Sequence, residues 1–268
     1  MWRARYEHSS PRGYAPPVTE PILVAPAELF GDGVFETVHL RPDGPWLLDA
    51  HLDRLFRSAA RAEVPLPERS VLAARAGEFT GDPEGALRII CTRRSQHLTA
   101  APIAADSLRE RRDGIRVVGA VVGRRPPWSL ARAKTLSYAE NFAARRWARQ
   151  RGADDVVLFD EDGYALEGST ASLVWLSGNE LCTVSPDEAE ILPGTTAARL
   201  LAVAGQVGLA SAYRMVKSDV LAQAEGIWLA SALRGLAEVR VWDGTPRPRS
   251  PWTPRLLDLL GYPAGLLS

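Results

Sequence analysis

Residues 124–129, which read RRPPWS, constrain the fold of this chain more than any other stretch. Two successive prolines restrict the backbone and remove two hydrogen-bond donors, so neither a helix nor the interior of a sheet is expected to continue through them. We therefore predict a linker at 124–129 between an N-terminal domain at 21–123 and a C-terminal domain at 130–268. Residues 1–20 are polar and rich in proline, and we expect a loose leader there.

The hydrophobic pattern predicts helices and strands in both domains. Apolar side chains recur three and four positions apart over residues 51–64, which is typical of an amphipathic helix. Residues 31–40 and 46–50 are predicted to form the strands of a hairpin, in which Phe35 and Thr37 point to one side and Glu36 to the other. After the linker we expect a helix at 139–152, a meander of strands at 154–185, and a helix following the turn at 191–196. This mixture indicates an α+β fold.

The composition argues against several kinds of partner. The chain has 32 basic and 32 acidic residues among 268, so its net charge is zero and no overall field favours nucleic acid or an anionic membrane. Its longest aliphatic run, VVGAVVG, is too short to span a bilayer. Cys91 and Cys182 lie far apart in apolar runs, and the four histidines have no metal-ligand spacing. We expect a soluble cytoplasmic protein without a metal site.

The scarcity of lysine draws attention to two residues. Lys134 and Lys217 are the only lysines among the 32 basic residues. Arginine stays protonated in proteins, whereas lysine can lose its proton and act as a nucleophile or base. A lysine retained in so arginine-rich a chain is a candidate for chemistry that needs a free amine. The alternative is that the two lysines persist by chance.

Three further hints accompany Lys134. Thr195 and Thr196 follow a Pro-Gly turn where a helix begins, so free amides and hydroxyls could bind a phosphate there, although a threonine capping its own helix is commoner. Arg54 lies at the edge of an apolar stripe and could bind paired phosphate oxygens, or could be an ordinary surface arginine. Glu167 has small or apolar neighbours and could pair with a protonated ring nitrogen, or could face water. An amine, a phosphate anchor and a carboxylate together are what pyridoxal 5'-phosphate (PLP) requires.

The chain resembles the class IV aminotransferases, the fold-type-IV PLP enzymes. The stretches that carry the resemblance occur in family order between about residues 30 and 243: FGDGVFETV, HLDRL, AKTLSY, GADDVVLFDEDGYALEGSTASLVW, ILPGTT and IWLASALRGLAEV. The family includes branched-chain and D-amino-acid aminotransferases and 4-amino-4-deoxychorismate lyases. The resemblance implies an N-terminal α/β sandwich, a C-terminal barrel-like domain, and a cofactor bound between them in a homodimer.

The resemblance also assigns roles to individual residues. It makes Lys134 the Schiff-base lysine, Arg54 a phosphate ligand and Glu167 the partner of the pyridine nitrogen. It assigns further cofactor contacts to four residues: Tyr138 near the phenolic oxygen, and Thr195, Thr196 and Ser231 at the phosphate. Lys217 matches no catalytic position.

The substrate is less constrained than the cofactor. Phe35, Thr37 and Arg93 are our candidates for substrate contacts, with Arg94 and Arg234 as alternative carboxylate binders. We predict a 4-amino-4-deoxychorismate lyase that forms pyruvate and 4-aminobenzoate for folate synthesis. The alternatives are an aminotransferase for D- or branched-chain amino acids and a cofactor-binding protein without turnover.

Overall fold

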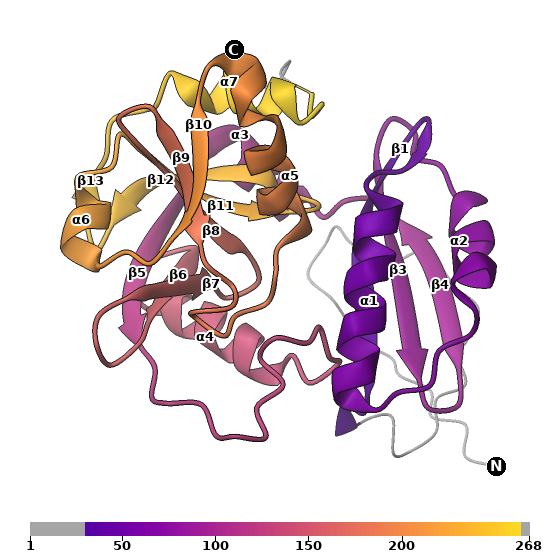
Figure 1. The fold of residues 1–268 in the computed structure, drawn as a ribbon. Helices are drawn as coiled ribbons and strands as arrows, with labels where there is room; N and C mark the ends of the chain where they lie inside the picture. The colour runs from indigo at the N-terminus through magenta and orange to yellow at the C-terminus, as the bar shows by residue number, and fades with distance from the viewer. Residues whose placement is uncertain (1–29, 264–268) are drawn as a thin grey trace, which may run out of the picture.

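The computed structural model describes residues 30–263, which form two lobes (Figure 1). The predicted leader at 1–20 lies outside these residues. The N lobe comprises residues 30–101 and the C lobe the remainder. Within the described residues no helix is both long and apolar enough to cross a bilayer.

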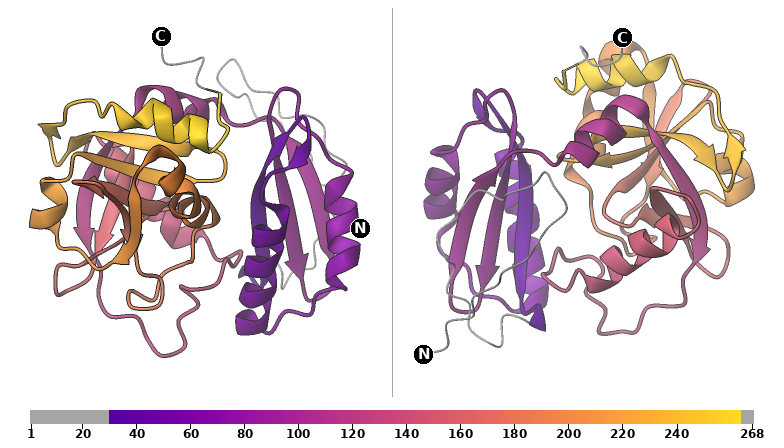
Figure 2. Two further views of the ribbon diagram at one scale, coloured as in Figure 1. Left: turned by 45° about the horizontal axis from the view of Figure 1, so that its top comes forward. Right: turned by 180° about the vertical axis from the view of Figure 1, so that it is seen from behind.

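The N lobe is a four-stranded sheet covered on one face by two helices. Its strands are ordered β2-β1-β3-β4, and all neighbours are antiparallel. Val34 and Val38 of β1 pack against Leu52 and Leu55 of α1, as the alternation predicts. In both views of Figure 2, α1 lies on the side of this lobe that faces the C lobe. The elements are β1 (Gly33–Arg41), β2 (Gly44–Pro45), α1 (Leu48–Ala62), α2 (Arg69–Gly77), β3 (Gly85–Thr92) and β4 (Gln96–Ala101).

The predicted strand at 46–50 is wrong, because this segment leads into α1. Leu47 has a φ of 57°, which turns the chain out of the hairpin, and the helix begins at Leu48. The three apolar residues 46–48 read equally well as a short strand or as the start of an amphipathic helix.

The C lobe is a nine-stranded, strongly curled sheet with helices around it. Eight strands follow the order β10-β9-β8-β11-β12-β5-β6-β7, and β13 pairs with β12. Its strands are β5 (Ile115–Val121), β6 (Asp155–Phe159), β7 (Ala165–Gly168), β8 (Ser172–Ser177), β9 (Glu180–Val184), β10 (Ala210–Arg214), β11 (Gly226–Ser231), β12 (Gly235–Trp242) and β13 (Thr245–Pro246). Its helices are α3 (Ala105–Asp113), α4 (Ala139–Arg149), α5 (Thr195–Val203), the 3₁₀ helix η2 (Ala204–Val207), α6 (Ser218–Ala222) and α7 (Trp252–Leu259).

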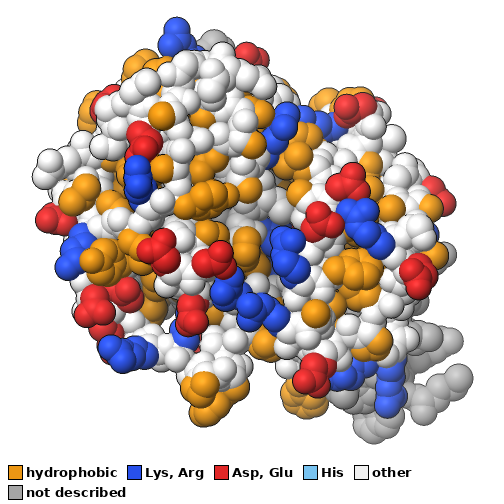
Figure 3. Space-filling view, in the orientation of Figure 1, with side chains coloured by type: hydrophobic (Ala, Val, Ile, Leu, Met, Phe, Trp, Pro, Cys, Tyr) orange, Lys and Arg blue, Asp and Glu red, His pale blue; other side chains and the backbone are white. Residues whose placement is uncertain are grey.

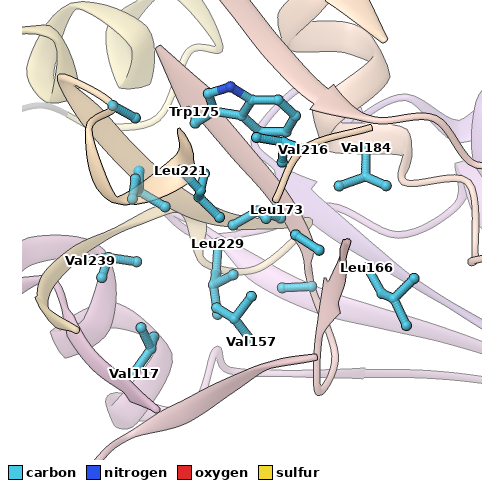
Figure 4. Close-up of a cluster of buried hydrophobic side chains, with 14 of the residues drawn as sticks. Val117, Val157, Leu166, Leu173, Trp175, Val184, Val216, Leu221, Leu229 and Val239 are labelled. Atoms are coloured by element: carbon cyan, nitrogen blue, oxygen red, sulfur yellow. The ribbon is translucent and has the colours of Figure 1, made fainter. Parts of the chain in front are cut away.

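The curl of this sheet encloses the largest of the three hydrophobic clusters in the C lobe. Val117, Val157, Leu173 and Leu229 come from four different strands and converge in the interior (Figure 4). The second core lies between the outer face of the sheet and helices α5 and α7. The lobe is therefore a filled, barrel-like body, as predicted.

The division between the lobes differs from the predicted linker. β5 pairs with β6 and β12, so α3 and β5 belong to the C lobe, and the chain crosses between lobes at residues 102–104. The prolines at 126 and 127 stand in a loop after β5. That loop returns the chain to the N lobe, where Thr135 forms an antiparallel bridge with Val34. A proline pair marks the end of regular structure, which need not coincide with a boundary between sheets.

Candidate active site

Lys134 is buried where the two lobes meet, with its amine among aromatic rings. Its Nζ donates a hydrogen bond to the Tyr138 hydroxyl at 2.8 Å. The same nitrogen lies 4.6 Å from the centre of the Phe35 ring, which meets the Tyr138 ring edge to face. Only 9% of Lys134 is exposed. The structure thus brings together three predicted site residues around one amine.

The backbone of Lys134 is fixed from the N lobe. Its carbonyl accepts the amide of Phe35 at 2.9 Å, and its own amide donates to Ser58 Oγ at 2.9 Å. Ser58 is fully buried on α1. The segment that carries the amine therefore behaves as an added edge strand on β1, held from one side by α1.

Arg54 is almost fully buried and is bound to a carboxylate that lies on the opposite side from Phe35. Its Nε and Nη2 donate to the two oxygens of Glu36, each at 2.7 Å. Its Nη1 donates to the carbonyl of Pro193 at 3.0 Å, which joins α1 to the C lobe. Burial would raise the pKa of Glu36, but Arg54 and His51 together hold it well below its usual range. Near neutral pH Glu36 is thus a buried anion that orients the guanidinium.

The turn at Pro193–Gly194 leads into the N-terminus of α5, where helix amides have no intrahelical partners. A Cβ at 194 would lie 2.0 Å from Ser172 Oγ and 3.1 Å from Ser172 Cβ, so any residue other than glycine would force Ser172 to shift. Thr195 and Thr196 follow as the first helical residues. Thr196 Oγ1 is buried and has no hydrogen-bond partner within residues 30–263. A buried hydroxyl without a partner next to free helix amides is suited to an anion.

Glu167 stands at the end of β7, with the guanidinium of Arg125 and the backbone amide of Leu192 as its hydrogen-bond partners. Its Oε1 lies 3.5 Å from Nη2 of Arg125, which also donates to the carbonyl of Glu190. Burial raises the pKa of Glu167 to about 7, against the opposing charges of Arg125 and, at longer range, Lys134. Glu167 also acts electrostatically on Arg54. It therefore belongs to the same group of side chains as the amine and can hold or give up a proton near neutrality.

Other predicted residues lie apart from this group. Arg93 is half-exposed and pairs with Asp32, and Arg234 is buried in hydrogen bonds to Asp155 and Thr170. Ser231 is partly exposed at the end of β11. Roles for these residues in binding substrate or phosphate stay predictions.

Three residues of the site were not singled out from the sequence: Glu36, His51 and Ser58. His51 and Ser58 occupy positions i and i+7 of α1, with Arg54 at i+3, so the helical period places all three on one face. This polar stripe beside the apolar one was the available signal.

The grouped side chains fit the cofactor that the sequence predicts. Arg54 keeps N–H groups beyond those given to Glu36 and Pro193. Together with the partnerless hydroxyl of Thr196 it offers donors to a phosphate. The amine of Lys134 and the carboxyl of Glu167 supply the other two requirements.

The chain is similar in sequence to known proteins. The family model described as Amino-transferase class IV matches residues 33–242. A Mycobacterium tuberculosis protein named bifunctional aminodeoxychorismate lyase / D-amino acid transaminase is 37% identical, over 84% of this chain and 86% of its own.

Solved structures agree in fold. A hypothetical aminotransferase from M. tuberculosis in its PLP-bound form has a TM-score of 0.82 at 34% identity, covering 92% of this chain and 93% of its own. The fold IV transaminase CpuTA1 from Curtobacterium pusillum has a TM-score of 0.80 at 34% identity, covering 92% and 89%. The predicted fold class is thereby confirmed.

Proposed function

The chain belongs to the class IV aminotransferase family, and we propose that it is a PLP-dependent 4-amino-4-deoxychorismate lyase. In this reaction the substrate is split into pyruvate and 4-aminobenzoate, which serves folate synthesis. PLP dependence is supported by one relative solved with PLP and by the fit of Lys134, Arg54, Thr196 and Glu167 to its functional groups. Bound PLP supplies an aldehyde that condenses with amines and a ring that withdraws electrons from the substrate carbon.

The side chains around Lys134 can move the protons that this chemistry requires. When its Nζ is a free amine, Lys134 can take a proton from a substrate carbon. The Tyr138 hydroxyl, 2.8 Å away, keeps that nitrogen in place. Glu167 can hold a protonated ring nitrogen, because its hydrogen bond from Arg125 is long, at 3.5 Å, and a carboxylate has further lone pairs with which to accept an N–H.

One observation favours a lyase. Thr37 follows Phe35 by two positions on β1, so both side chains project from the same face of the strand, and the Phe35 ring contacts the amine. A lyase must protonate the departing enol-ether oxygen, and Thr37 offers a hydroxyl on the face that meets Lys134. A transaminase has no leaving group and needs no such donor.

The second candidate is a D-amino-acid transaminase, because the name of the M. tuberculosis relative includes that activity. A transaminase alternates between amino donor and keto acceptor with ping-pong kinetics, whereas a lyase needs no acceptor. Purified protein should therefore release pyruvate and 4-aminobenzoate in equal amounts from aminodeoxychorismate with no keto acid present. Turnover that depends on added keto acid would replace the lyase assignment with the transaminase.

We also propose a homodimer. Phe30, Trp128 and Phe142 are 86%, 80% and 53% exposed, and apolar side chains protrude from both lobes at the lower end of Figure 3. In the dimer that we propose, the partner subunit would cover these aromatic side chains. Sedimentation equilibrium should give twice the mass of the chain, and Trp128→Asp should shift the protein toward the monomer.

A further inference from the structure

The buried face of α1 includes a histidine to which the proposed chemistry assigns no role. His51 is fully buried, three residues before Arg54 on the same helix. One ring nitrogen, Nδ1, lies 2.7 Å from Oε2 of Glu36, the oxygen that also accepts Arg54 Nη2. The other, Nε2, faces the C lobe, where Thr195 Oγ1 lies 3.4 Å away, at the long end of hydrogen-bonding distance.

The surroundings settle which groups donate. Burial lowers the pKa of His51, and the positive charges of Arg54 and Lys134 lower it further against the attraction of Glu36. The ring is therefore neutral and carries one proton. A carboxylate can only accept, so that proton is on Nδ1 and Nε2 is an acceptor. In the contact between Thr195 and His51, the hydroxyl is therefore the donor.

The two threonines at the start of α5 consequently have different roles. The hydroxyl proton of Thr195 points at the histidine, away from any anion at the helix N-terminus. The hydroxyl of Thr196 has no partner within residues 30–263 and is free to donate to one. This differs from the prediction that both threonines offer their hydroxyls to the phosphate.

We propose that His51 is a positioning residue that joins Thr195 to Arg54 through Glu36, so that the turn before α5 and the guanidinium hold the cofactor phosphate as one unit. This rests on the proposed PLP dependence. The connection crosses between lobes: Glu36, His51 and Arg54 belong to the N lobe, and Thr195 belongs to the C lobe. Together with the bond from Arg54 to the Pro193 carbonyl it fixes the distance between the two halves of the phosphate site.

Two substitutions each remove the contact between Thr195 Oγ1 and His51 Nε2. Thr195→Val keeps the shape of the side chain and removes the hydroxyl. His51→Asn keeps an amide nitrogen close to the place of Nδ1, where it can still donate to Glu36, and removes the acceptor Nε2. Thr195→Ser restores the hydroxyl and is the conservative control.

We would titrate cofactor-stripped protein with PLP and with pyridoxal, which lacks the phosphate, and follow binding by absorbance. The quantity compared between variants is the dissociation constant of each compound. Each single substitution should weaken PLP binding about five-fold, the value of one ordinary hydrogen bond, and leave pyridoxal binding unchanged. The double variant should be no weaker than either single one, because both remove the same contact. Thr195→Ser should bind PLP as the wild type does.

Thr196→Val provides the matched comparison. It removes a hydroxyl that does not face His51, so its effect should add in full to that of His51→Asn. Additive losses for Thr195→Val and His51→Asn, or equal losses for PLP and pyridoxal, would overturn the positioning role. If His51→Asn does not fold, as judged by urea unfolding, the contrast between Val and Ser at 195 decides the matter. Wild-type protein that binds PLP no more tightly than pyridoxal would instead overturn the proposed function.

Discussion

Replacing Glu36 by glutamine tests whether the buried anion holds the N-lobe half of the site together. Two donors of Arg54 and one of His51 point at its two oxygens within 2.7 Å. Glutamine keeps the size of the side chain but turns one acceptor into a donor, so at least one hydrogen bond becomes a donor–donor contact. It also leaves the Arg54 charge buried without a counter-ion.

The expected loss of stability in Glu36→Gln follows from the burial of the ion pair. Breaking a buried ion pair by neutralising one partner costs about 3–5 kcal/mol. Since whole domains unfold at a cost of about 5–15 kcal/mol, urea denaturation of Glu36→Gln should show a large drop in midpoint. Glu68→Gln, at an exposed position, is the control and should change the free energy of unfolding by less than about 0.5 kcal/mol.

The pH dependence gives the same test a second readout. The pKa of Glu36 is depressed in the folded protein, so its stabilising effect is complete above the ordinary value of 4.5 and is lost as the pH falls toward the folded value. The wild type should therefore lose stability on acidification more steeply than Glu36→Gln. A variant within 1 kcal/mol of the wild type at pH 7, with the same acid profile, would refute the reasoning.

The remaining predictions concern the candidate active site. Lys134→Arg should abolish turnover and borohydride labelling, because a guanidinium keeps its proton and cannot condense with an aldehyde; Lys217→Arg should retain both. Glu167→Gln should lower turnover at least about 10²-fold yet stabilise the cofactor-free protein above pH 7. The folded carboxyl of Glu167 keeps its proton to about pH 7 and the unfolded one only to about 4.5, so the part of wild-type stability that depends on Glu167 falls between these values, and the fall should be smaller in the variant. Ser58→Ala should cost about 1–3 kcal/mol in urea unfolding, since it leaves the Lys134 amide buried without an acceptor.

Elements with a strong apolar period were predictable from the sequence. The stripe at 51–64 corresponds to α1, and the alternation in β1 placed Glu36 and Val38 on the face opposite Phe35. β4 and α3 were not predicted, because QHLTAA and ADSLRERRD present no continuous apolar face; most of α3 is charged. Their positions depend on pairing with β3 and packing on β12, which are contacts between distant parts of the chain.

The residues of the candidate active site likewise differ in how far the sequence alone reveals them. Lys134 stood out by composition, since an arginine-rich chain has little reason to keep a lysine except for its chemistry. Glu36 and His51 did not, because each reads as an ordinary polar residue until its partner is known. Burial of a carboxylate is unfavourable alone and becomes tolerable only beside Arg54, which stands 18 positions further along. A buried acid of this kind can be found only after the elements have been paired. Once the buried face of β1 is set against the buried face of α1, an acid on the strand lies opposite a histidine and an arginine that are one helical turn apart. That arrangement predicts the ion pair, and with it the orientation of the arginine.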